Sequence, residues 1–362
     1  MGWWQRSILR NVTFNFQHST LKLYSMRNAI TRFNFYLDQL QALMIKAAKQ
    51  KNPGLWLYQN NARTPLFMLE GLAKLYAGLH NKKKFTKLKE HFKLLEDILG
   101  AVDYYDAFAK EFANNKNIPA NVTAYLQAQA REKIQSLNEA LKEDEWLGAG
   151  KNRIDKIRKK LEEADWKKSG AEIKCIKDFY DKSIAEIIEF VGKTNCRFTN
   201  VESEVHESRR KLRWLSIYPQ ALRGCIQLTS PTQKSGQPKT NTKALEKYLV
   251  PEITNSPFNK MPDAGDNNDF LLLHQNYFYA LSWMIAELGK LKDSGLRLVA
   301  IREALQQTSS ISDEDALAKA KGFIGGDQPD IPQVLIKANQ ICATYFKEQT
   351  LAKLVIGCAN AL

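Results

Sequence analysis

The stretch that decides the fold of this chain reads Val205-His206-Glu207-Ser208-Arg209-Arg210-Lys211-Leu212-Arg213-Trp214. On a helix, where successive residues are about 100° apart, one face of this stretch is basic and carries His206, Arg209, Arg210 and Arg213. The opposite face is apolar, and we expect it to be buried: Leu212, Leu215, Tyr218 and Leu222. No acid lies among the basic residues, although Glu202, one turn earlier, is placed to pair with His206. Because like charges one turn apart repel, this basic stripe is either a solvated helix face or a binding surface for a polyanion.

The whole chain shares this basic character. Its 362 residues include 53 Lys and Arg against 39 Asp and Glu, which gives a formal net charge of +14. A surplus of this size favours anionic partners and carries no information about the fold. A hydrophobic content of 44% is sufficient for a packed core, so the length predicts one large helical domain or two of ordinary size.

The cysteines and the apolar runs bear on location and on metal binding. The 5 cysteines are widely spaced and form no C-x-x-C pair, which predicts reduced, mostly buried thiols and a cytoplasmic protein. No Cys or His stands at metal-ligand spacing from another, so we expect no metal site and no cofactor. No segment approaches about 18 uninterrupted apolar residues, so we expect no transmembrane helix and no membrane partner.

Apolar residues recur with a period close to 3.6, and alternation with period 2 is nearly absent, which predicts an all-α fold without strands. The expected helices cover residues 21–45, 63–79, 83–112 with an interruption at Gly100, 122–141, 154–161, 171–191, 200–222, 270–291, 296–305, 313–320, 332–346 and 349–361. Residues 230–268 are rich in Pro, Asn, Ser and Thr and predict a long functional or mobile connection with a short helix over 245–249.

This pattern divides the chain into three parts. Residues 1–37 contain no acid and resemble an amphipathic transit segment, but the helical pattern continues through Asp38, so we interpret 1–54 as a structured, basic helical segment. Residues 55–325 form the main helical region. Residues 326–362 predict a C-terminal helical hairpin.

One short pattern occurs in both halves of the main region. Leu99-Gly100 is followed by Asp103, and Leu288-Gly289 is followed by Asp293. A glycine allows two helices to cross closely, and the nearby carboxylate can then orient a basic side chain. The pattern therefore suggests two similar helical bundles.

Together, the basic stripe and the two Leu-Gly…Asp helices resemble the CHAD domain, the conserved-histidine alpha-helical domain, over roughly residues 55–300. The resemblance implies an all-α fold of two pseudo-symmetric helical bundles packed around a basic cavity, and a protein that binds inorganic polyphosphate without catalysis. It also implies a ligand site that includes His206, Arg209, Arg210 and Arg213. In the first half, the segment corresponding to the stripe keeps only Arg63, whereas Phe67, Met68 and Glu70 stand where the family places cations.

Other basic residues could compensate for this loss. Lys83 and Lys87 belong to a lysine cluster at the start of the helix expected over 83–112, although a solvated surface is the simpler interpretation. We therefore add Lys83 and Lys87 to the candidate ligand-binding residues.

Catalytic patterns do not appear: the chain has no GxSxG, Walker A or HExxH sequence, so we expect no enzyme. The acidic cluster Asp263, Asp266 and Asp269 predicts a solvated turn that caps a helix beginning at Phe270. Two alternatives to polyphosphate binding stay open. The first is a scaffold associated with nucleic acid, and the second is a protein-interaction scaffold whose stripe pairs internally with acids such as Asp103, Asp106 or Asp293. The sequence does not specify the oligomeric state.

Overall fold

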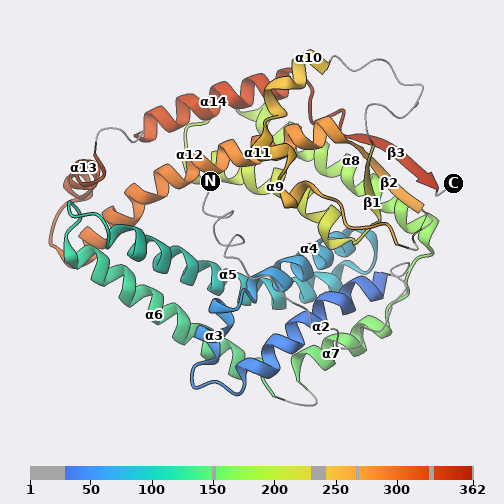
Figure 1. The fold of residues 1–362 in the computed structure, drawn as a ribbon, viewed down its shortest axis with the longest axis horizontal. Coiled ribbons are helices and arrows are strands. Elements are labelled where there is room, and N and C mark those ends of the chain that lie inside the picture. The colour runs from blue at the N-terminus through green and yellow to red at the C-terminus, as the bar shows by residue number, and fades with distance from the viewer. Residues whose placement is uncertain are drawn as a thin grey trace.

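Long helices form most of the structure, a computed structural model that describes residues 29–148, 152–229, 242–265, 267, 269–325 and 330–360 (Figure 1). The all-α class is confirmed. The helices are α2 (Ala29–Ala47), α3 (Pro53–Gln59), α4 (Arg63–Leu79), α5 (Lys82–Phe112), α6 (Ala120–Glu143), α7 (Arg153–Glu162), α8 (Ser169–Lys193), α9 (Glu207–Ala221), α10 (Thr242–Leu245), α11 (Pro251–Thr254), α12 (Gln275–Thr308), α13 (Asp313–Ile324) and α14 (Ile331–Lys347). A π-helical turn (Val201–His206) leads directly into α9, and single 3-10 turns cover Glu246–Tyr248 and Pro257–Asn259.

A small sheet corrects the prediction that no strands are present. Its strands are β1 (Ile226–Thr229), β2 (Asp269–His274) and β3 (Val355–Asn360), in the order β1-β2-β3. β1 runs parallel to β2, and β3 runs antiparallel to it. Two predictions were therefore wrong: Asp269 belongs to β2 instead of capping a helix at Phe270, and the last segment of the expected C-terminal hairpin is a strand. Short apolar runs such as 270–273 fit a strand or a helix equally well by periodicity.

Two other expected boundaries were also wrong. α5 runs without a break through Gly100, and α12 joins the two helices expected over 270–291 and 296–305 into one. The helix expected over 200–222 begins instead as the π-helical turn, whereas its predicted apolar face is confirmed, because Leu212, Leu215, Tyr218 and Leu222 are all buried.

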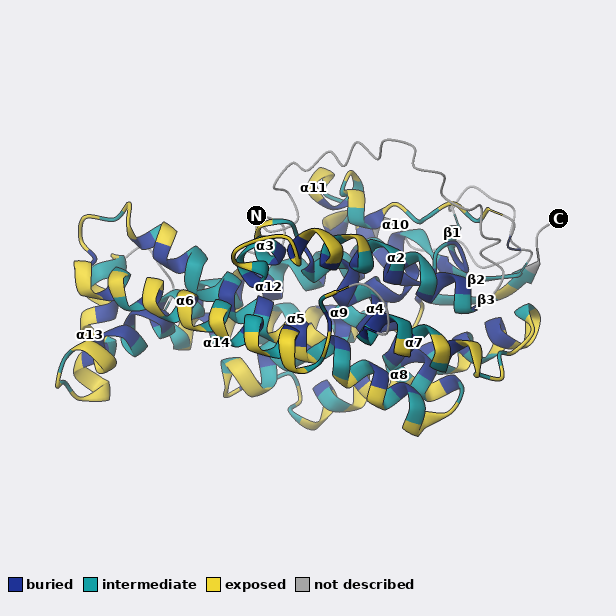
Figure 2. Cartoon of the chain, turned by 90° about the horizontal axis from the view of Figure 1, so that it is seen from below, coloured by how far each residue is buried: buried dark blue, intermediate teal, exposed yellow. Residues whose placement is uncertain are grey.

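The described helices enclose two separate hydrophobic cores (Figure 2). The larger core takes residues from α2, α4, α8, α9 and α14 as well as from β2, so it includes parts of all three segments expected from the sequence. The smaller core joins the C-terminal halves of α5 and α12 to α6 and α13, through residues such as Phe108, Leu126 and Ile301. Only α5, α6 and α12 contribute described residues to both cores.

Polar contacts accompany the smaller core. The hydroxyls of Tyr105 and Tyr125 each donate to Glu303 Oε1 on α12 over 2.9 Å. The Nε atom of Arg297 lies 2.5 Å from Glu111 Oε1 on α5. These bonds join α5 and α6 to α12 at the end of the molecule that is farthest from the sheet (Figure 1).

A buried ion pair joins α2 to α8 inside the larger core. Arg32 Nη1 lies 2.8 Å from Glu172 Oε2, and each side chain is only 1% exposed. The hydroxyl of Tyr76, on α4, donates to Glu172 Oε1 over 2.5 Å and accepts from Arg32 over 3.0 Å. The charges are thus buried as a hydrogen-bonded group, because burial of either charge alone would be costly.

The predicted N-terminal segment lies mainly outside the described residues, as do residues 230–241 of the long connection. The short helix expected over 245–249, in the long connection, appears as α10 followed by a 3-10 turn. None of the described helices combines the length and the apolar character that crossing a bilayer requires.

We predict that Arg32→Met lowers the free energy of unfolding by about 3–5 kcal/mol, because it leaves the Glu172 carboxylate buried without its cation. Urea denaturation measures the loss. As a control, Lys177→Met removes an exposed ion pair with Asp181 and should cost about 0.5 kcal/mol or less. The double variant Arg32→Met/Glu172→Met should recover most of the stability. A loss in Arg32→Met no larger than in the control would contradict the role of the ion pair.

Candidate anion-binding cavity

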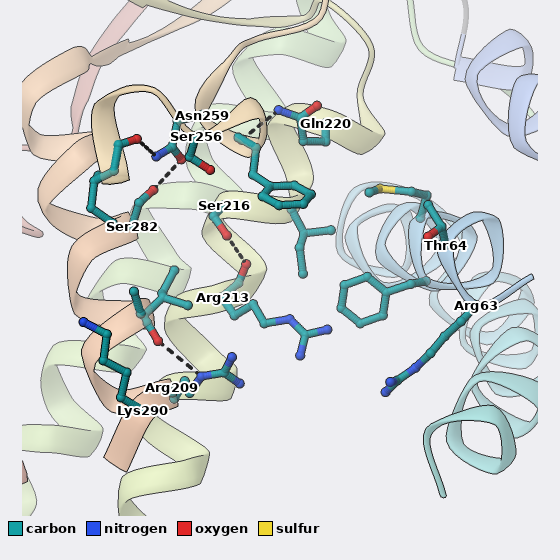
Figure 3. A pocket seen from close by; sticks show the side chains of 18 of the residues that line it. Arg63, Thr64, Arg209, Arg213, Ser216, Gln220, Ser256, Asn259, Ser282 and Lys290 are labelled. Carbon is teal, nitrogen blue, oxygen red and sulfur yellow. Dashed lines mark hydrogen bonds between the residues drawn. The ribbon is translucent and has the colours of Figure 1, made fainter. Parts of the chain in front are cut away.

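Two adjoining chambers lie between α4 on one side and α9 and α12 on the other, and α5 also lines the larger of them. The larger has a volume of about 440 Å³ and the smaller about 190 Å³. Five residues line both chambers and therefore stand between them: Arg63, Phe67, Arg209, Arg213 and Ile217. We call these five residues the partition. In Figure 3, Arg209 and Arg213 extend from α9 toward the side of α4 that carries Arg63.

Arg209 is held against a glycine of α12. Its side chain is buried, and its Nε donates to the carbonyl oxygen of Ile285 over 3.2 Å. A Cβ atom at Gly289 would lie 3.0 Å from that Nε, so the guanidinium occupies the space that only a glycine leaves open. Burial lowers the pKa of Arg209, and the charge of Asp293 opposes this effect.

Arg63 makes the corresponding contact in the first half of the chain. A Cβ atom at Gly100 would lie 2.7 Å from its Nη2. Its Nε lies 2.7 Å from Glu96 Oε1, and its Nη1 lies 3.4 Å from Asp103 Oδ2. Each Leu-Gly…Asp segment therefore places a glycine and a nearby aspartate beside an arginine of another helix.

These contacts also bear on the alternative in which acids neutralise the stripe internally. Asp103 pairs with Arg63, and Asp293 interacts electrostatically with Arg209. Asp106, the third acid considered, accepts from Tyr58 instead, over 2.6 Å, and pairs with Lys110. Two of the three acids considered thus act on arginines of the cavity, Asp103 on Arg63 and Asp293 on Arg209.

Arg213 lies between these two arginines and interacts with an aromatic ring. Its guanidinium carbon is 4.2 Å from the centre of the Phe67 ring, which itself stacks on Trp214 at 5.0 Å. Burial lowers the pKa of Arg213 well below its ordinary value, and the positive charges of Arg209 and Arg63 lower it further. Phe67, which stands where the resemblance implied a cation, thus supports a cation supplied by α9.

His206 and Arg210 lie at the edge of the larger chamber and line it. His206 ends the π-helical turn, and its Nδ1 is 2.6 Å from Glu202 Oε1, as the sequence predicted. This hydrogen bond is the main cause of the lowered pKa of Glu202. The side chain of Arg210 is 58% exposed, and its Nε lies 2.7 Å from Glu207 Oε2. The expectation of a stripe without a neighbouring acid was therefore wrong, because Glu207 neutralises Arg210.

The lysines that line the larger chamber are not those selected from the sequence. Lys83 and Lys87 are exposed and line neither chamber, so their part in binding stays a prediction. The lysines of the larger chamber are Lys74 on α4, Lys89 and Lys93 on α5, and Lys292 on α12. The four-residue spacing of Glu70 and Lys74, and of Lys89 and Lys93, is the only sequence signal that could have indicated them.

Burial and like charges shift the protonation of this chamber. The pKa of Lys74 and that of Lys292 are each lowered to about 8, first by burial and then by neighbouring arginines, Arg210 for Lys74 and Arg209 for Lys292. Burial, with the negative charge of Glu96, raises the pKa of Glu70 to about 7. Perturbed groups gathered in one cavity are typical of functional sites.

Comparisons with protein-family models, with curated proteins and with solved structures gave no match to this chain.

We predict that Gly289→Ala lowers the free energy of unfolding by about 1–3 kcal/mol, because the new methyl group overlaps the Arg209 guanidinium. Gly100→Ala should act in the same direction through Arg63. Thermal or urea denaturation measures both. Gly192→Ala in α8 is the matched control, because no neighbouring segment comes within 4 Å of the position that its Cβ would take. It should raise stability by about 0.5–1 kcal/mol, as alanine favours a helix over glycine. An equal gain in the free energy of unfolding for Gly289→Ala and Gly192→Ala would contradict the close contact between Arg209 and Gly289.

Proposed function

We propose that this chain is a non-catalytic, CHAD-like protein that binds a phosphate-rich polyanion in the larger chamber, with inorganic polyphosphate as the best candidate. The observation that carries this proposal is the convergence of Arg63, Arg209 and Arg213 at the partition. A guanidinium is planar and donates in a fixed fork, which matches the oxygens of a phosphate. A phosphate at the partition would also raise the pKa of Arg213, which burial lowers first and the charges of Arg209 and Arg63 lower further.

The rest of the larger chamber extends this positive region. Lys74, Lys89, Lys93 and Lys292 surround the partition, and His206 and Arg210 lie at the edge. Acids of the same chamber, such as Glu96 and Asp103, are engaged chiefly with Arg63. Asp97 of the same chamber pairs with Lys93. Lys74, Lys89 and Lys292 are thus the further contacts that we propose for successive phosphates of one chain.

The shape of the site favours polyphosphate over duplex nucleic acid. Arg209 is buried and Arg213 is half-buried between helices, whereas a duplex is contacted through its phosphates along an accessible surface. A slender chain of phosphates can enter such a chamber. Nucleic acid therefore stays the second candidate, and competition between it and inorganic polyphosphate distinguishes the two.

We predict that Arg213→Met weakens polyphosphate binding about 10–100-fold, which corresponds to one charge-assisted contact of about 1.5–3 kcal/mol. The logarithmic dependence of affinity on salt should become shallower by about 0.7–0.9. Isothermal titration calorimetry at several salt concentrations measures both effects. Thermal denaturation checks that the variant stays folded.

The matched surface variant is Lys83→Ala/Lys87→Ala, which removes exposed charges outside both chambers. Its affinity should remain within about twofold of the original if the chamber is the site. If the lysine variant loses binding and Arg213→Met does not, the polyanion binds at the surface of α5 instead.

We predict that polyphosphate affinity falls as the pH rises from 6 to 9. A bound anion favours the charged form of Lys74 and Lys292 and the neutral form of Glu70, so it raises all three pKa values and binding takes up protons. At pH 6 these groups are mostly protonated in the free protein, so binding is near its full strength. The affinity begins to fall as the pH passes about 7, where Glu70 ionises, and about 8, where Lys74 and Lys292 lose their charge. Calorimetry in buffers of different ionisation enthalpy should show proton uptake at pH 8 and almost none at pH 6. Proton release at pH 8 would contradict this electrostatic account.

A further inference from the structure

The smaller chamber differs in chemistry from the larger one. Apart from the partition, its walls carry apolar side chains and short neutral polar ones, such as Met68, Phe258 and Ala286. Among the described residues that line it there is no acid, and Lys290 is the only cation beyond the partition. The arginines of the partition therefore separate a charged space from a predominantly apolar one.

Part of the predicted long connection builds one wall of this chamber. Ile253 at α11 and Phe258 and Asn259 in the following 3-10 turn all line it. This wall is fixed, because Asn259 Nδ2 donates to the carbonyl oxygen of Ile253 over 2.8 Å and its Oδ1 accepts from Ser282 on α12 over 2.7 Å. Gln220 on α9 donates to the carbonyl oxygen of Phe258 over 3.1 Å (Figure 3).

These bonds leave the wall with few polar groups for a ligand, so burial of apolar surface is the main interaction that it offers. The volume of the smaller chamber, about 190 Å³, is sufficient for a flat ring, since a cavity of about 150 Å³ accommodates benzene. A ring seated there would place an attached phosphate at Arg209 and Arg213.

We propose that the smaller chamber binds the ring of an aromatic or nucleoside phosphate, whose phosphates cross the partition into the larger chamber. The inference rests on the proposed function, because it assigns the phosphates to the same arginines. It extends that function by selecting organic phosphates over inorganic chains of the same length.

Adenosine triphosphate and inorganic tripolyphosphate test this inference, because both present three linked phosphates and only one carries a ring. Calorimetry on the full chain should show that adenosine triphosphate binds about tenfold or more tightly, as expected for burial of an apolar ring. Ala286→Phe fills the smaller chamber and should remove this difference, with tripolyphosphate affinity kept within about twofold. Ala128→Phe, at an exposed position of α6, is the matched control and should keep the difference.

Ser256→Phe fills the chamber from the connection before the 3-10 turn and replaces Ala286→Phe if that variant unfolds at a lower temperature. Equal affinities of the two ligands for the unaltered protein would overturn the inference and leave the proposed function intact. An equal loss of both ligands in the two filled variants would also overturn it. Failure of both ligands to bind the unaltered protein would overturn the proposed function as well.

Discussion

The structure depends on a guanidinium that lies against a helical glycine, once in each half of the chain. Arg63 from α4 occupies the space beside Gly100 of α5, and Arg209 from α9 occupies the space beside Gly289 of α12. Any larger residue than glycine would push the charge away from the helix axis. The contact therefore fixes how closely each pair of helices approaches and, at the same time, where its positive charge lies. The partition between the two chambers follows directly from these two placements.

The charges at the partition are not equally compensated. Arg63 has two carboxylates within ion-pair distance, and the charge of Asp293 acts on Arg209. Arg213 has the face of the Phe67 ring and the charges of Glu96 and Glu70. The resulting repulsion is stored in the native fold and opposes stability, a common property of binding sites that await a ligand. The lowered pKa of Lys292, caused by burial and by Arg209, is a second sign of the same excess of positive charge.

The sequence predicts the parts of this arrangement that depend on local periodicity. The bounds of α4 and the buried face of α9 follow from apolar spacing, and the Leu-Gly…Asp pattern indicated that each aspartate could orient a basic side chain. The missed features depend on contacts between distant segments. β2 becomes a strand because β1 and β3 pair with it, and Phe67 supports a cation only because α9 packs across α4. Exposed lysines such as Lys83 could not be distinguished from chamber lysines by composition.

The separation of the two hydrophobic cores has a mechanical consequence. The larger chamber lies beside α5 and α12, which run from one core to the other as continuous helices. Long helices bend gradually at little cost, whereas close-packed cores resist deformation. The width of the larger chamber can therefore change by flexure of these two helices while both cores keep their packing. The two cores hold α5 and α12 at both ends, so these helices bend between the cores, where the larger chamber lies.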